Sequence, residues 1–468
     1  MSIWVVGALY LIGLAIASKM ARDQQTDEAT SFVLGGSNLN VFLGVLTYGA
    51  TLFSTFTLMG MPNFFRVHGV GAWIFLGVTD VAMAYVVLVF GLKLRQRFKN
   101  KGYLNVSSFI KDQYTAKWTP TVYLLGIFLF LIPYTAVQLK GIGEFLEASI
   151  PGHFPMWGWA SIMLVIILIY SSIGGFKAIV YSDAIQGILL LFTSWIIGYL
   201  CLKEFSSLEN LFFALEKSQP KLLSVPGPNN LFTFQFLISS YLAIILMPMS
   251  QPQLTTRLLA MADDKKLRQM AASLAFFSII IIFPAIFIGL AGALKYGEVA
   301  APIFWAKTLI TDRPELLGAF SVIGLLAAAM STADSQLFAL GNETHILFKN
   351  DPKKIKTHTK FIIAIFALLS LLFAVYAKGD LVPLARLSFA GTSLLAPMVF
   401  LPVWQHRKQH GPLLPLMTLM ALLLFLSAYI LKIIPSTVFH LRLDLALLLA
   451  LFSVSLFCGK FQSKELHL

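Results

Sequence analysis

The segment Ala327-Ala328-Ala329-Met330-Ser331-Thr332-Ala333-Asp334-Ser335 places four oxygen-bearing side chains within five residues of an apolar run at 317–347. On a helix, Ser331 and Ser335 are one turn apart, and Asp334 lies beside them. Such a cluster is costly in hydrocarbon unless it faces a partner or a water-filled cavity. A small hard cation such as Na⁺ prefers several oxygen ligands, as other hard cations do. The segment therefore predicts a buried helix that supplies part of a Na⁺ site.

A structural interpretation of the same hydroxyl groups remains open at this point. Ser and Thr in membrane helices often bond to the carbonyl one turn back, or join helices by hydrogen bonds. Asp334 favours a functional site, because carboxylates within a membrane usually mark one. It could also lie at the membrane edge, where water would solvate it.

The composition of the chain is that of a polytopic membrane protein. Of its 468 residues 57% are hydrophobic and 12% are charged, and the mean hydropathy is +0.79. The net charge of +13 could suggest nucleic acid, but most Lys and Arg residues, Arg257 among them, fall in alternate short loops. This pattern predicts an inner-membrane protein with its N-terminus outside and its C-terminus in the cytoplasm. No metal-ligand spacing, nucleophile elbow or phosphate loop is present, so we expect no enzyme.

The apolar runs predict an all-α fold with 13 transmembrane helices, each near the ~20 residues that a bilayer requires. The expected spans are 2–18, 38–62, 70–95, 120–149, 156–173, 178–201, 231–256, 269–295, 317–347, 358–377, 382–404, 412–432 and 440–459.

Two of these spans contain residues that interrupt helices. The second carries Gly44, Gly49, Gly60 and Pro62 among several hydroxyl residues, and the seventh carries Pro248 and Pro252 within 247–253. The two spans are five apart, as equivalent positions in two five-helix repeats would be. Interrupted helices at matching positions are the best sequence indication of a transporter binding site. The alternative is that Gly and Pro merely serve packing, which membrane helices often permit.

A second motif reads Gly174-Gly175-Phe176-Lys177-Ala178-Ile179-Val180-Tyr181-Ser182-Asp183-Ala184-Ile185-Gln186. Together with Ala-Ala-Met-Ser-Thr-Ala-Asp-Ser-Gln at 328–336, it resembles the sodium/solute symporter family over essentially the whole chain. The resemblance implies one transporter domain over 1–468, with an extra first span at 2–18. It further implies an inverted five-plus-five repeat at 38–201 and 231–404, with discontinuous helices 2 and 7, followed by two C-terminal spans at 412–459.

The resemblance also implies a set of Na⁺ ligands. The main site would use the carbonyls of Ala50, Phe53 and Ala328 and the hydroxyls of Ser331 and Thr332. This agrees with the prediction from the residues, since carbonyls released in an unwound turn would meet hydroxyls on a facing helix.

Some members of the family have a second cation site, which would involve Asp183, Asp334 and Ser335 here. Asp334 replaces a hydroxyl of the family pattern, and two neighbouring carboxylates would favour a cation or a proton between them. Asp183 could instead cap a helix, because Ser182-Asp183 suits a helix N-terminus, or it could form a cytoplasmic gate.

The solute remains open among amino acids, monocarboxylates, sugars and vitamins. Proline carriers of the family place aromatic residues where this chain has Ile244 and Pro248, which argues against proline itself. Asp80 lies near the position of an acidic residue in sugar carriers. The candidate solute contacts are Thr57, Asp80, Tyr134, Gln138, Tyr241 and Gln251, although each could equally form a helix–helix hydrogen bond.

The resemblance therefore predicts a secondary transporter that couples Na⁺ influx to uptake of a small polar solute by alternating access. Two alternatives are a proton-coupled carrier of the same fold, for which Asp183 and Asp334 could serve, and a solute sensor that does not transport. We expect the lipid bilayer and the solute as partners, and neither nucleic acid nor an obligate protein partner.

Overall fold

The computed structural model describes residues 2–24, 29–99, 101–347, 352–377, 379, 381–405 and 409–461. These residues form helices joined by loops, with one small hairpin in which β1 (Thr437–Val438) pairs antiparallel with β2 (Leu441–Arg442). The long helices are α1 (Ser2–Asp23), α6 (Gly77–Phe98), α8 (Thr119–Ser149), α9 (Met156–Lys203), α14 (Asp264–Tyr296), α16 (Glu315–Glu343), α17 (Pro352–Tyr376) and α21 (Leu443–Phe461).

The remaining helical segments are shorter and lie between the long ones. They are α2 (Ala29–Leu34), α3 (Val41–Leu52), η1 (Phe56–Gly60), α4 (Met61–His68), α5 (Gly71–Phe75), α7 (Val106–Gln113), α10 (Leu208–Ser218), η2 (Pro220–Leu223), α11 (Phe234–Ile245), α12 (Met247–Ser250), α13 (Pro252–Ala260), α15 (Ala301–Ala306), η3 (Lys307–Thr311), η4 (Thr344–Leu347), α18 (Leu381–Ser393), α19 (Ala396–Trp404), α20 (Leu413–Phe425) and η5 (Leu426–Ile430).

Among the described residues, nine helices are long and apolar enough to cross a membrane, or ten if a bent pair counts as one span. Three shorter apolar helices lie at Met156–Ser171, Phe234–Ile245 and Leu443–Gly459, where the sequence also predicts spans. The membrane-spanning, helical class is confirmed. The count of 13 and the inverted repeat stay predictions.

The second expected span is interrupted, as predicted. Helix α3 ends at Leu52, Phe53 is extended (φ −91°, ψ 108°), and the chain resumes in η1 and α4 after a bend of 60°. Local side chains compete for the backbone here: the amide of Phe56 donates to Ser54 Oγ at 3.1 Å, and the amide of Ser54 donates to Thr57 Oγ1 at 3.3 Å. The break leaves carbonyls of the last turn of α3 without helical partners.

The seventh expected span is interrupted as well. It consists of α11, α12 and α13, and Gln251 between the last two is extended (φ −111°, ψ 111°). Proline lacks an amide hydrogen and clashes with the preceding turn, so Pro248 and Pro252 account for the interruptions. Thr255 Oγ1 donates to the carbonyl of Pro248 at 2.8 Å and so satisfies one acceptor that the break releases.

The fifth and sixth expected spans form one helical run, α9, that is kinked at Gly175 (φ 56°, ψ −147°). This backbone conformation is accessible essentially to glycine alone.

Replacing Gly175 by Ala should therefore lower the stability of the protein by about 1–3 kcal/mol, because the added Cβ strains the kink. The measurement is thermal unfolding of the purified protein in detergent. The control is Gly7→Ala, where the new Cβ would meet its nearest neighbour at 3.6 Å without strain. Equal unfolding midpoints for the two variants would contradict the expectation.

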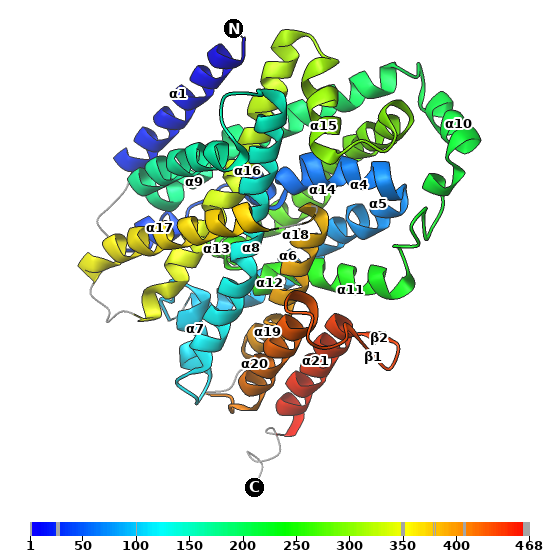
Figure 1. Ribbon diagram of the computed structural model, residues 1–468. Helices are drawn as coiled ribbons and strands as arrows, with labels where there is room; N and C mark the ends of the chain where they lie inside the picture. The colour runs from blue at the N-terminus through cyan, green and yellow to red at the C-terminus, as the bar shows by residue number, and fades with distance from the viewer. Residues whose placement is uncertain are drawn as a thin grey trace.

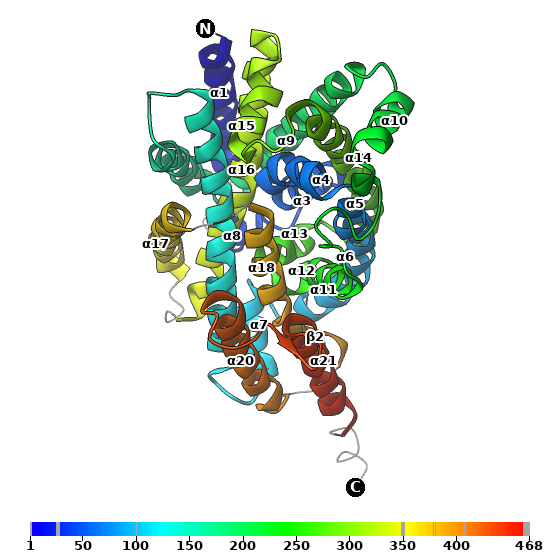
Figure 2. The same ribbon diagram turned by 45° about the vertical axis from the view of Figure 1, so that its right-hand side comes forward.

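Helix α16 forms the centre of the fold. It contacts α1, α3, α8, α9, α13 and α17, and its residues 327–343 are all buried. Figure 1 shows α16 with α1 and α9 on one side, and Figure 2 shows the long α8 passing beside it. Helices α20 and α21 lie apart from this core at the opposite end from α1. The oxygen cluster of α16 is thus held where several helices meet.

Candidate functional site

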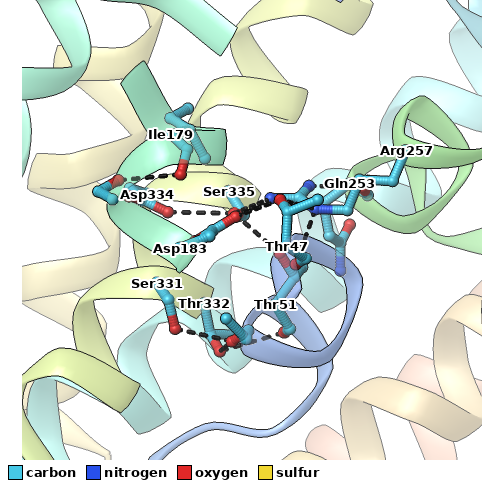
Figure 3. Close-up of polar contacts among 12 residues, drawn as sticks. Thr47, Thr51, Ile179, Asp183, Gln253, Arg257, Ser331, Thr332, Asp334 and Ser335 are labelled. Carbon is cyan, nitrogen blue, oxygen red and sulfur yellow. Dashed lines mark hydrogen bonds and ion pairs between the residues drawn. The ribbon is translucent and has the colours of Figure 1, made fainter. Parts of the chain in front are cut away.

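The hydroxyls of Ser331 and Thr332 on α16 face the broken end of α3 (Figure 3). Ser331 Oγ lies 2.7 Å from the carbonyl of Ala50 and 3.1 Å from that of Ala328. Thr332 Oγ1 lies 3.1 Å from the carbonyl of Thr51 and 3.3 Å from that of Ala50. All five residues are buried. Five neutral oxygens therefore converge between two helices. A hard cation could bind their lone pairs if the two hydroxyl O–H bonds rotate away from the carbonyls.

Four of the five expected Na⁺ ligands are part of this group, and one is not. Among the described residues, its hydrogen bonds include the carbonyl of Thr51 but not that of Phe53. Both residues lie at the end of α3, where the exact position of the break decides which carbonyls turn toward α16.

A second tier of polar contacts surrounds Arg257, which lies on α13 and is 1% exposed (Figure 3). Its Nη2 donates to Asp183 Oδ2 at 2.7 Å and to Ser335 Oγ at 2.6 Å. Its Nε donates to the carbonyl of Thr47 at 3.0 Å, and its Nη1 to the carbonyl of Gln253 at 2.8 Å. A guanidinium thus lies among residues for which the sequence suggested a second cation site.

Asp334 belongs to the same tier but is bound differently. It accepts a hydrogen bond from the hydroxyl of Tyr170 and another from Ser335 Oγ at 3.1 Å. Because Ser335 donates to Asp334, the contact of 3.1 Å between the hydroxyls of Ser335 and Thr51 is donated by Thr51. Thr51 therefore joins the two tiers: its carbonyl faces Thr332 and its hydroxyl faces Ser335.

Two interpretations from the sequence are wrong at this point. Asp183 does not cap a helix, because it lies well inside the second half of α9, eight residues after the kink at Gly175. Its carboxylate accepts hydrogen bonds from Arg257 and from Thr47 Oγ1. Arg257 is not a loop residue. The apolar residues 258–260 that follow it could have indicated that the buried segment continues beyond 256.

Three of the candidate solute contacts lie around the break in the second span. Gln138 Oε1 accepts from the amide of Thr55 at 3.2 Å, and Thr57 accepts from the amide of Ser54. Tyr134, one turn from Gln138 on α8, interacts with the side chain of Ser54. These contacts place α8 directly against the unwound segment.

The other three candidates are separate. Gln251 lies in the second break, where its Nε2 donates to Thr392 Oγ1 at 3.2 Å. Tyr241 is half-buried on α11, and among the described residues no hydrogen bond joins it to the other candidates. Asp80 is buried on α6, near Tyr134 and Tyr48.

Comparison with known proteins gives one consistent result. The sequence model of the sodium:solute symporter family matches residues 32–418. The sodium/pantothenate symporter of Haemophilus influenzae is 24% identical over an alignment of 471 positions, which covers 93% of this chain and 93% of that one. The osmoregulated proline transporter of Bacillus subtilis is 24% identical and covers 88% of this chain and 86% of that one.

Solved structures of similar fold point the same way. The chain resembles a Na⁺-coupled sialic acid symporter with a TM-score of 0.80, 15% identity and 98% coverage of both chains. It also resembles a nucleobase-cation-symport-1 family transporter with a TM-score of 0.59 and 13% identity, over 93% of this chain and 95% of that one. At such identities these two matches describe the fold alone.

Proposed function

Because the chain belongs to the sodium:solute symporter family, we propose that the oxygens between α3 and α16 bind the Na⁺ that drives its transport. The protein is a Na⁺-coupled secondary transporter of a small-molecule solute. The observation that carries the proposed site is the contact of Ser331 and Thr332 with the carbonyls of Ala50 and Thr51. No formal charge is required, because five dipolar oxygens share the ion.

Coupling follows from the position of this site. An ion bound between α3 and α16 favours the arrangement in which the two helices are close. The same break in the second span carries the contacts to Gln138 and Tyr134, where we place the solute. Each ligand then stabilises the conformation that binds the other, and this effect is reciprocal. The membrane potential adds about 2.3 kcal/mol per charge per 100 mV.

We propose that the protein takes up its solute by alternating access, and this can be tested in proteoliposomes. An inward Na⁺ gradient should produce accumulation of a solute that binds the protein. Binding without accumulation would indicate a sensor, and accumulation driven by a pH gradient alone would indicate a proton-coupled carrier. The relatives named above are Na⁺ symporters or transporters, which favours the first outcome.

We place the protein in the inner membrane, with its N-terminus outside and its C-terminus in the cytoplasm. The distribution of Lys and Arg among the loops supports this orientation. Activity of a cytoplasm-dependent reporter fused after 468 would test it.

We expect one Na⁺ per cycle rather than two. Arg257 supplies a fixed positive charge to Asp183 and Ser335, and this charge opposes a second Na⁺ between them. The initial rate of uptake should therefore depend hyperbolically on Na⁺ concentration. A sigmoidal dependence, or a measured ratio of two Na⁺ per solute, would contradict this expectation.

A further inference from the structure

One buried carboxylate in the core differs from all the others. The described residues contain five buried acids: Asp80, Asp183, Asp334, Glu343 and Asp444. Asp183 and Asp444 pair with arginines. Asp334 accepts from two hydroxyls, and Glu343 accepts from the amides of Val106 and Ser107.

Asp80 is 5% exposed, and its carboxylate makes no hydrogen bond or ion pair with any described residue. An ionised carboxylate that is buried without a partner costs several kcal/mol. A binding partner from outside the chain could remove this cost.

Asp80 lies near the region where we place the solute. It interacts electrostatically with the phenol groups of Tyr48 on α3 and Tyr134 on α8. Tyr134 in turn interacts with Ser54 in the break of the second span. The hydroxyl of Tyr48 is buried and has no hydrogen-bond partner, so an unused polar group lies near the unpaired charge.

Aromatic rings border the same region. The ring of Tyr134 packs edge-on against Phe389 at 4.8 Å, and Phe389 packs edge-on against Phe56 at 5.8 Å. A carboxylate beside aromatic rings is a favourable environment for an organic cation, because ring faces attract positive charge.

The buried cations of the described residues bind other groups. Arg257 pairs with Asp183, and Lys140 donates to the carbonyls of Ala377 and Gly379. Arg66 donates to the side chain of Asn63 and to the carbonyls of Gly297 and Val299. Among the described residues, none of these cations pairs with the carboxylate of Asp80.

We propose that the solute carries a protonated amino group and that this group pairs with Asp80. This inference rests on the proposed function, since it assigns the chemistry of the transported solute. It separates the chain from a carrier of purely anionic or polyhydroxylated solutes, which would leave the charge of Asp80 unbalanced.

The test is a set of matched compounds added to the purified protein in the presence and absence of Na⁺, with thermal unfolding as the readout. Each amine is paired with its hydroxyl analogue: L-alanine with L-lactate, and putrescine with 1,4-butanediol. Choline, a quaternary ammonium without an N–H, is paired with its neutral analogue 3,3-dimethylbutan-1-ol and shows whether positive charge alone is sufficient. Pantothenate and galactose serve as solutes without an amine. We expect Na⁺-dependent stabilisation by at least one amine and by none of the analogues. Comparison of alanine with putrescine and choline shows whether the solute also needs a carboxylate.

The variant Asp80→Asn forms the second part of the test. It should weaken binding of the stabilising amine at least about tenfold, or 1.4 kcal/mol, while the stabilisation by Na⁺ alone is retained. Retention of the Na⁺ effect shows that the variant is folded. Solute-free Asp80→Asn should also unfold at a higher temperature than the unaltered protein, because an uncompensated charge has been removed.

The outcomes distinguish this inference from the proposed function. Absence of stabilisation by every amine, stabilisation by a hydroxyl analogue instead, or unchanged amine affinity in Asp80→Asn would each overturn the inference. Na⁺-driven accumulation of a solute without an amine would overturn it too, yet would leave the proposed function intact. Loss of any response to Na⁺ would count against the proposed function itself.

Discussion

Replacing both Ser331 and Thr332 by Ala should raise the Na⁺ concentration for half-maximal uptake by about 100-fold. Each substitution removes one oxygen ligand, and a hydrogen bond or contact to a charged group contributes roughly 1.5–3 kcal/mol. A loss of 1.4 kcal/mol is already about tenfold in affinity. The maximal rate should fall less than the affinity, because the helices that form the pathway are retained.

The readout is uptake as a function of Na⁺ concentration, together with the amount of folded protein in the membrane. Ser321→Ala is a matched control on the same helix: Ser321 is buried, and its hydroxyl donates to the carbonyl of Leu317 at 2.8 Å. Thr332→Ser retains the hydroxyl and should remain close to the unaltered protein. Unchanged half-saturation in the double variant would remove the basis for the site.

Replacing Arg257 by Gln should destabilise the protein by about 3–5 kcal/mol. Removal of one partner of a buried ion pair leaves the other charge uncompensated, and here that charge is the carboxylate of Asp183. The variant also loses the bonds that hold α13 to α3, α9 and α16 through Thr47, Asp183 and Ser335. Thermal unfolding in detergent measures the effect.

The double variant Arg257→Gln with Asp183→Asn tests whether the uncompensated charge of Asp183 causes the loss of stability. Because it removes both charges, it should recover much of the stability lost in Arg257→Gln alone. Lys266→Gln is a suitable comparison, since the side chains of Lys266 and its partner Asp263 are both exposed and an exposed pair contributes little. If Asp183→Asn lowers the stability of the Arg257→Gln variant further, the broken ion pair is not the cause of the lost stability.

The sequence was sufficient for those parts of the site that depend on local chemistry. Gly, Pro and hydroxyl residues interrupt helices through their own backbone preferences, so the breaks near Phe53 and Gln251 could be predicted. The cluster at 331–335 indicated the inward face of α16, because these polar groups require a partner in an apolar run.

The sequence was insufficient where a contact in the site depends on the exact residue at which a helix ends, or on a partner far away along the chain. Thr51 rather than Phe53 faces Thr332 because α3 ends where it does, and such ends are hard to place. Arg257 was assigned to a loop because it lies one residue beyond the expected span. Its partner Asp183 is 74 residues away along the chain. No local pattern connects the two.

Under the proposal of one Na⁺ per cycle, Arg257 also limits the solute concentration ratio that the protein can reach across the membrane. The positive charge of Arg257 is covalently part of α13 and cannot be released on the other side of the membrane. It therefore adds no driving force to solute transport. If one Na⁺ moves per cycle, a potential of 100 mV contributes about 2.3 kcal/mol through that ion, or roughly fiftyfold enrichment for a neutral cargo. A second mobile ion would square that ratio. If Arg257 takes the place of that ion, as we propose, the protein reaches a lower ratio but uses less of the sodium gradient per cycle.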